Sequence, residues 1–141
     1  MEVNYMKYKV AFVCVHNSCR SQMAEGWANK LGEDIFKAYS AGTRDYKEVK
    51  PLAIKVMQEV GVDIRGHKPK LLSEIPQELD ILITMGCNVV CPFVPNSYME
   101  DWGIEDPSGL PIENFREARD LIKKKVEELI IRIKANEVRF N

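Results

Sequence analysis

An apolar strand, a short turn and an amphipathic helix follow one another near the N-terminus, and this succession constrains the fold more than any other feature. Residues 9–14 are mainly Val, Ala and Phe, which predicts a buried strand. Apolar side chains recur every fourth residue from Met23 to Leu31, so residues 21–31 are expected to form a helix that ends at Gly32. A buried strand leading directly into a helix is typical of α/β proteins.

The alternation of strands and helices continues along the chain. Further strands are predicted at 36–40, 79–84 and 97–102, further helices at 51–60 and 113–136, and a short helical turn at 87–91. Nearly continuous apolar strands are typical of a parallel sheet covered on both faces. With the second strand at an edge, we expect a three-layer α/β sandwich whose four-stranded parallel sheet has the order 2-1-3-4, with helices on both faces. We expect a single domain spanning residues 1–141.

Charge and hydropathy exclude several classes of function. The 20 Lys and Arg residues nearly balance the 21 Asp and Glu residues, which argues against a general nucleic-acid binder and against a polybasic membrane-surface protein. No apolar run approaches the roughly 18 residues that a membrane span requires. We therefore expect a cytoplasmic protein in which the four cysteines are thiols, any disulfide being transient or catalytic.

The turn between the first strand and helix carries a Cys-x5-Arg pattern from Cys14 to Arg20. Backbone N–H groups in such a turn, together with a helix N-terminus and a guanidinium, suit a tetrahedral oxyanion and favour a thiolate. Ser21 is placed to donate to that thiolate. A cysteine at the end of a strand is often only a small core residue, and the pattern also occurs by chance. The flanking strand, helix and Ser21 favour catalysis. The residues expected to surround the oxyanion are Val15, His16, Asn17, Ser18, Cys19 and Arg20.

Three further residues are expected at the same edge of the sheet. Cys87 follows the third strand, and in the predicted order it lies near Cys14, within reach of a disulfide after a modest loop movement. Cys91 is four residues further on, so a Cys87–Cys91 disulfide requires the turn to change shape. Asp106 follows the fourth strand and is a candidate general acid, although Asp-Pro is commonly a turn. The alternative is that Cys87 and Cys91 are inert buried thiols. A metal site that includes them is a weaker alternative, because the chain has too few other cysteines and histidines to complete it.

Several motifs resemble the low-molecular-weight protein tyrosine phosphatase superfamily, and within it the thioredoxin-linked arsenate reductases. These motifs are CVHNSCRSQMAEG at 14–26, YSAGT at 39–43, EVGVDI at 59–64, TMGC at 84–87, CP at 91–92 and EDWGIEDP at 100–107. The resemblance covers nearly the whole chain. The phosphatase branch typically has Asp-Pro-Tyr where this chain has Asp106-Pro107-Ser108, and it lacks the second cysteine pair.

The resemblance implies a relay of three thiols. Cys14 would attack arsenate, for which phosphate or sulfate is an analogue, while Arg20 holds the oxygens and Asp106 protonates the departing hydroxyl. Cys87 would release arsenite by forming a disulfide with Cys14, and Cys91 would then take over that disulfide. The reductant would be thioredoxin, or glutaredoxin with glutathione. No tightly bound cofactor is expected, but some relatives bind a potassium ion, for which the matching positions are Asn17, Glu25, Ser40 and Asp63.

The chain departs from the family pattern in the loop and in the cysteine spacing. Only three residues separate Cys87 from Cys91, fewer than in better-known reductases. His16 stands where a small residue is usual, so it is either a tolerated residue facing solvent or one that tunes Cys14 or crowds large substrates. Cys19 is expected to be structural, with a protective Cys14–Cys19 disulfide as the alternative. Two alternative functions remain: a phosphatase that uses Cys14, Arg20 and Asp106, and a non-enzymatic redox-sensing or oxyanion-binding module.

Overall fold

The computed structural model describes residues 7–86 and 95–140. Its strands are β1 (Tyr8–Cys14), β2 (Phe36–Gly42), β3 (Leu79–Thr84) and β4 (Asn96–Asp101). Its α-helices are α1 (Arg20–Leu31), α2 (Pro51–Glu59) and α3 (Ile112–Lys134), and Leu72–Glu74 forms a short 3-10 helix, η1. The predicted elements therefore form within two residues of their expected bounds, except the turn at 87–91, which lies outside the described residues.

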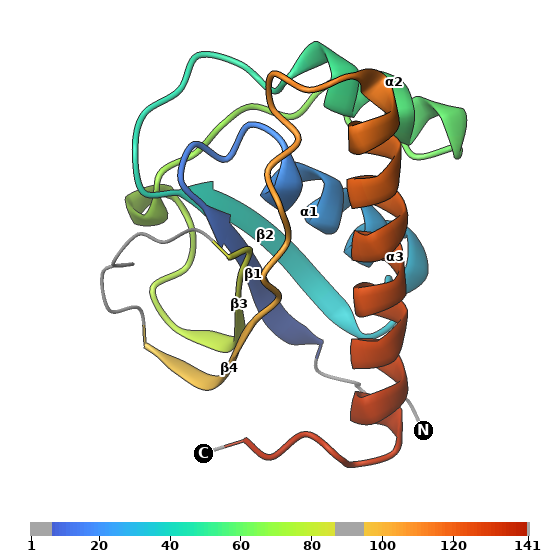
Figure 1. Ribbon diagram of the computed structural model, residues 1–141. Coiled ribbons are helices and arrows are strands. Elements are labelled where there is room, and N and C mark those ends of the chain that lie inside the picture. The colour runs from blue at the N-terminus through green and yellow to red at the C-terminus, as the bar shows by residue number, and fades with distance from the viewer. Residues whose placement is uncertain (1–6, 87–94, 141) are drawn as a thin grey trace.

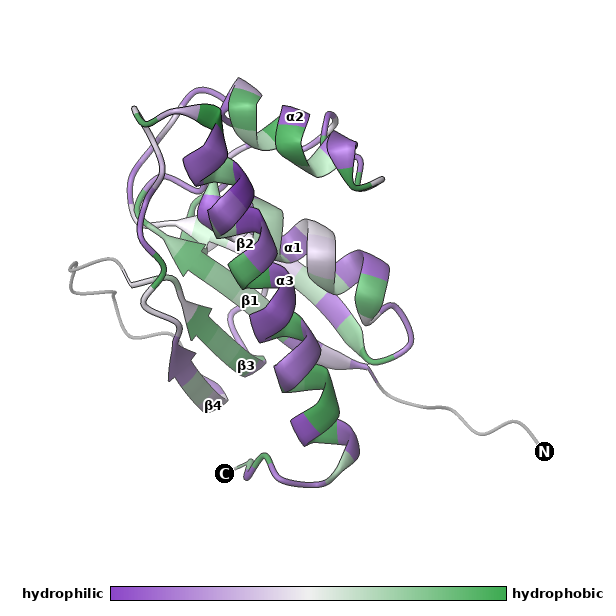
Figure 2. Cartoon of the chain, turned by 45° about the vertical axis from the view of Figure 1, so that its right-hand side comes forward, coloured by the Kyte–Doolittle hydropathy of each residue, from purple (hydrophilic) through white to green (hydrophobic). Residues whose placement is uncertain are grey.

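The four strands form one parallel sheet in the order β2-β1-β3-β4, which confirms the predicted α/β topology. All four arrows point the same way (Figure 2). In the register, Cys14 lies beside Gly42 on β2, and Val13 lies beside Thr84 on β3. The loops that follow the strands are therefore gathered at one edge, where parallel sheets bind their ligands.

The larger core lies between the sheet and the three α-helices, which group together in Figure 1. Val10 and Phe12 on β1 face this core, because side chains two residues apart share one face of a strand. Met23 and Trp27 of α1 and Leu129 of α3 pack into it, and the polar side of α3 faces outward (Figure 2). Within residues 7–86 and 95–140, no helix is both long and apolar enough to cross a membrane.

A smaller core lies on the opposite face of the sheet. Ala11 and Val13 of β1 point to this face and pack with Ile75 and Leu82. The segment around η1 covers them, and Gly42 at the end of β2 pairs with Leu71 just before η1. This pairing brings the chain from 67 to 71 against the edge where Cys14 lies.

Candidate active site

The loop from Cys14 to Arg20 is fixed on both sides by backbone hydrogen bonds. Thr43 and Arg44 donate to Val15 at 2.8 and 2.9 Å, and Lys50 donates to Ser18 at 2.7 Å. Gly42 allows this close approach, because a Cβ there would lie 2.7 Å from the Val15 oxygen. Asn17 has a φ of 55°, in the left-handed region, so the backbone turns sharply inside the loop. A left-handed residue beside right-handed ones can point successive backbone N–H groups toward the inside of a loop.

Cys14 and Ser21 lie together beneath the loop. The sulfur of Cys14 is 2.8 Å from the Ser21 hydroxyl, and both residues are buried. The side-chain amide of Asn17 donates to the same hydroxyl at 2.8 Å. Since the hydroxyl accepts from Asn17, its own hydrogen is free to point at the sulfur. The Ser21 hydroxyl is therefore able to donate to the Cys14 sulfur, as the predicted role of Ser21 requires.

Arg20 is buried at the start of α1 and is held by two carbonyl groups. Its Nη1 donates to Met85 at 2.8 Å and to Ile104 at 2.7 Å, just beyond the ends of β3 and β4. Both hydrogens of Nη1 are thereby used, which fixes the plane of the guanidinium. Cys19, the residue before α1, makes no side-chain capping bond. The first N–H groups of α1 are thus left without a side-chain cap at Cys19, as in helices that bind anions.

Asp106 lies opposite Arg20 and is half exposed. Its Oδ2 is 3.9 Å from Nη2 of Arg20, and its Oδ1 accepts from the Ser108 N–H at 3.0 Å. Burial raises the pKa of Asp106, but the hydrogen bonds from Ser108 and the charges of Arg20 and Lys50 outweigh it, so that the pKa lies below its usual value. An anion bound at Arg20 would offset these positive charges and help Asp106 to hold a proton.

Cys19 differs from Cys14 in its surroundings. It is buried, and burial raises the pKa of its thiol far above the usual value, with the charges of Asp106 and Cys14 adding to the effect. The structure therefore keeps Cys19 as a neutral thiol at ordinary pH, in line with a structural role. Both Cys14 and Cys19 are free thiols.

A network of polar side chains beneath the loop was not predicted. Gln22 donates to Asn17 and to the carbonyl of Lys68, and its Oε1 contacts His67 at 2.9 Å. His67 also reaches Glu25, at 3.0 Å. Lys70 reaches Asn17 and Glu25 from the same segment. The usable signal was Gln22 and Glu25, two polar residues on the helix face that packs beneath the loop.

Three of the four positions expected to bind potassium belong to this network, and Asp63 does not. Asn17, Glu25 and Ser40 are linked through it, with the Ser40 hydroxyl 3.2 Å from Glu25. Asp63 instead binds Arg65 with both carboxylate oxygens at 3.0 Å, and its side chain is 61% exposed. The four residues therefore do not form one ligand set, and we assign no step of the chemistry to potassium.

His16 lies at the rim of the loop. Its ring packs against the ring of Tyr46, with the centroids 4.9 Å apart. Lys50 lies over the Tyr46 ring, and its Nζ donates to the Tyr46 hydroxyl at 2.6 Å. His16 is exposed, which agrees with the expected residue facing solvent, and its ring also packs against Tyr46.

Cys87 and Cys91 lie outside the described residues, so their predicted positions stay predictions. The chain that leads to them is described as far as Gly86. Asp101 accepts from the N–H of Gly86 at 2.7 Å and from the Thr84 hydroxyl at 2.9 Å. A Cβ on Gly86 would lie 2.6 Å from the Cα of Gly103, so two glycine backbones touch where β3 and β4 end.

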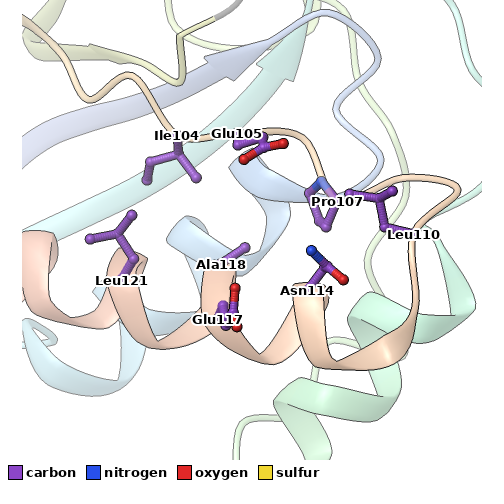
Figure 3. Close-up of a pocket in the computed structure, with 8 residues that line it drawn as sticks. All are labelled: Ile104, Glu105, Pro107, Leu110, Asn114, Glu117, Ala118 and Leu121. Carbon is purple, nitrogen blue, oxygen red and sulfur yellow. The ribbon is translucent and has the colours of Figure 1, made fainter.

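A separate hollow lies between the loop after β4 and α3 (Figure 3). Its lining includes Ile104, Pro107, Leu110 and Leu121 but no residue of the Cys14–Arg20 loop. Neither Cys14 nor Asp106 lines it, so this hollow is not the centre of the chemistry.

Comparisons with known proteins agree with this geometry. The model of the family described as low molecular weight phosphotyrosine protein phosphatase matches residues 9–139. An arsenate reductase of Staphylococcus aureus (strain Newman) is 42% identical over 125 residues, or 86% of this chain and 95% of that protein. A solved arsenate reductase in the phosphate-binding state is 40% identical with a TM-score of 0.79, covering 91% of this chain and 99% of that one. The thioredoxin-dependent arsenate reductase of Corynebacterium glutamicum is 30% identical with a TM-score of 0.76, over 95% of this chain and 65% of its own. The chain therefore belongs to the low molecular weight phosphotyrosine protein phosphatase family.

Proposed function

We propose that this protein reduces arsenate to arsenite, with Cys14 as the nucleophile. The observation that carries the proposal is the convergence of Cys14, Ser21 and Arg20 in a chain whose relatives, at 42% identity, are arsenate reductases. Arsenate has the same tetrahedral shape as phosphate, and a relative with a phosphate-binding state has the same fold. The fork of Arg20 and the N–H groups of the loop suit such an anion.

In the first step, the Cys14 thiolate attacks arsenic and a sulfur–arsenic bond forms. One arsenate hydroxyl leaves as water, taking its proton from Asp106. Asp106 sits 3.9 Å from Arg20, so an anion held by Arg20 lies within reach of its carboxyl group. Ser21 stabilises the thiolate before attack through its hydroxyl, 2.8 Å from the sulfur.

In the second step, a Cys87 thiolate attacks the Cys14 sulfur. A sulfur–sulfur bond forms as the sulfur–arsenic bond breaks, and the bonding electron pair stays on arsenic, which leaves as arsenite. A Cys91 thiolate then attacks Cys87 and releases Cys14 as a thiolate. The two electrons gained by arsenic come from two thiols, which end as a Cys87–Cys91 disulfide. The described chain leads to Cys87 from Met85, whose carbonyl binds Arg20.

The reductant that we propose for the Cys87–Cys91 disulfide is a thioredoxin. A relative from Corynebacterium glutamicum is thioredoxin-dependent, and it covers 95% of this chain. A dithiol protein supplies both electrons in one exchange. Glutaredoxin with glutathione is the alternative donor, and the assay below separates the two.

The test is arsenite release under a complete thioredoxin couple, with NADPH consumption followed at the same time. We expect one NADPH consumed for each arsenite, no turnover for Cys14→Ser or Cys87→Ser, and normal turnover for the control Ser73→Ala, at an exposed position in η1. Cys91→Ser should release a single arsenite and stop as a Cys14–Cys87 disulfide, visible by mass spectrometry. Replacing thioredoxin by glutaredoxin and glutathione identifies the donor.

The competing function is phosphate-ester hydrolysis with Cys14, Arg20 and Asp106 alone. The family as a whole is described by that activity. It requires neither Cys87 nor Cys91. Hydrolysis of p-nitrophenyl phosphate that survives Cys87→Ala, at rates far above arsenate turnover, would overturn the assignment as a reductase.

A further inference from the structure

We propose that Lys70 supplies, from within the chain, the positive charge beneath the catalytic loop, so that this loop is held without an alkali cation. Lys70 comes from the segment that lies against the end of β2. Its backbone N–H donates to Asn17 Oδ1 at 2.8 Å, and its carbonyl accepts from Gly42 at 2.7 Å. Both bonds fix the main chain of Lys70, which places its ammonium group 3.8 Å from Glu25 Oε1.

Glu25 is the group that requires a positive partner. It lies on α1 and is only 8% exposed, and a buried carboxylate is costly unless it is paired and hydrogen-bonded. Its Oε1 accepts from the Ser40 hydroxyl at 3.2 Å and faces Lys70, and its Oε2 lies 3.0 Å from His67. Both oxygens thus have partners from the protein itself.

His67 completes this set of donors. Its Nδ1 lies 2.9 Å from Gln22 Oε1 and 3.0 Å from Glu25 Oε2. Gln22 uses its amide nitrogen to donate to Asn17 and to the carbonyl of Lys68, so its oxygen can only accept. Since Nδ1 faces two acceptors, it carries a hydrogen. The space around Glu25 is therefore filled by donors, whereas a bound cation requires acceptors.

The candidate ligand Asp63 does not compete for this position. Arg65 engages both oxygens of the Asp63 carboxylate, and this side chain is 61% exposed. The neighbouring oxygens already have donors or act as donors. Asn17 Oδ1 accepts from Gln22 and Lys70, the Lys68 carbonyl accepts from Gln22 and from the Lys70 ammonium at 3.3 Å, and the Ser40 hydroxyl donates to Glu25. A tethered ammonium fits this arrangement better than a free ion.

Lys70 acts on the nucleophile through Asn17. The backbone N–H of Lys70 donates to Asn17 Oδ1, which turns the amide nitrogen of Asn17 toward Ser21 and orients Ser21 toward Cys14. The ammonium group pairs with Glu25 and thereby holds this N–H in place, so loss of the ammonium loosens the chain of hydrogen bonds to Cys14. Lys70 is therefore a positioning residue. This role concerns the support of Cys14, so it holds whether the loop reduces arsenate or hydrolyses esters.

The first test compares the unaltered protein in potassium, sodium and choline chloride at equal ionic strength. Two quantities are measured: the midpoint of thermal unfolding, and the rate of alkylation of Cys14 by iodoacetamide, followed by mass spectrometry of its peptide. We expect both to be the same in the three salts. A rise in the unfolding midpoint or the alkylation rate that is specific to potassium would overturn the proposal.

The second test uses variants of Lys70, with the exposed Lys47→Met as the matched control. Lys70→Met should shift the pH profile of Cys14 alkylation to higher pH and slow it several-fold at neutral pH, and Lys70→Arg should restore most of the rate. Lys70→Asp adds an oxygen ligand beside Glu25, so its stability should become potassium-dependent. An unchanged pH profile in Lys70→Met, or a Lys70→Asp variant that ignores potassium, would count against the proposal. If Lys70→Met fails to fold, Lys70→Arg and the salt comparison still decide.

Discussion

The side-chain amide of Asn17 donates to the Ser21 hydroxyl at 2.8 Å, and this bond determines where Ser21 points its own hydrogen. The orientation of the amide is itself fixed, because the opposite atom, Oδ1, accepts from the backbone N–H of Lys70. The direction of the hydrogen bond at Cys14 is therefore set by Lys70, acting through Asn17 and then Ser21.

Removing that hydrogen bond should weaken the thiolate. In Ser21→Ala, the loss of one hydrogen bond to a charged group, about 1.5–3 kcal/mol, predicts roughly ten- to hundredfold slower alkylation of Cys14 at neutral pH. The measurement is the pH profile of iodoacetamide alkylation. Ser73→Ala, at an exposed serine in η1, is the control and should leave the profile unchanged. A Ser21→Ala profile identical to that of the unaltered protein would mean that Ser21 only fills space.

Gly42 should be irreplaceable where the loop crosses the end of β2. A Cβ there would lie 2.7 Å from the oxygen of Val15, 2.8 Å from the backbone of His16 and 2.9 Å from that of Asn17. Since all three atoms are backbone, Gly42→Ala must displace the loop, which predicts a loss of about 1–3 kcal/mol in the free energy of unfolding. Phosphate affinity should fall as well.

Calorimetry and thermal unfolding measure both effects of Gly42→Ala. The matched control is Gly66→Ala, because a Cβ at Gly66 meets no atom within 4 Å. Phosphate binding of normal strength in Gly42→Ala would show that the loop tolerates displacement.

Asp106 should be required for chemistry and dispensable for binding. Asp106→Asn keeps the size of the side chain but cannot supply a proton, and loss of a general acid costs roughly 10²–10⁴-fold in rate. The expected result is a fall in kcat for arsenate with phosphate affinity retained or improved, since the amide does not repel the anion. Glu105→Gln, the exposed neighbour, is the control. Full turnover by Asp106→Asn would assign the proton to another donor.

The positions of Cys14, Ser21 and Arg20 could be predicted from the sequence, because a loop between a buried strand and a helix has few arrangements. The order of the strands was predicted from the alternation of strands and helices with the added assumption that the second strand lies at an edge, which the structure confirms. The polar residues that support the loop could not be predicted from the sequence. Lys70 and Gln22 are 48 residues apart, and no periodicity relates the segment before η1 to α1. Asp63 was predicted as a potassium ligand only because its position matches one in the resembling family. In the structure its carboxylate instead forms an ion pair with Arg65, two residues further along the chain.

Glu100 should make the protein sensitive to acid. Burial raises its pKa, but hydrogen bonds from Arg132, Tyr98 and Trp102 together outweigh this effect and lower the pKa to about 2, against an ordinary value of 4.5. Its side chain is 21% exposed. Because the folded-state pKa is depressed, this stabilisation is complete above about pH 4.5 and is lost as the pH falls toward 2.

The variant Glu100→Gln should therefore lose about 1–3 kcal/mol of stability at pH 7, and less at pH 2. Urea unfolding at a series of pH values measures the difference between the two proteins, which removes the contribution of the other carboxylates. Glu113→Gln, whose carboxylate is 69% exposed beside Arg116, is the control. A difference that stays constant from pH 7 to 2 would contradict the assignment of this acid sensitivity to Glu100.

The neutral state of Cys19 has a consequence for the direction of sulfur exchange. Once Cys14 carries a substituent, its sulfur becomes the target of the next thiolate, and the thiol nearest in sequence within the loop is Cys19. Burial keeps Cys19 protonated, and a protonated thiol is a poor attacker. Attack of Cys19 on the Cys14 sulfur is therefore slow, and a thiol from outside the loop reacts with Cys14 faster.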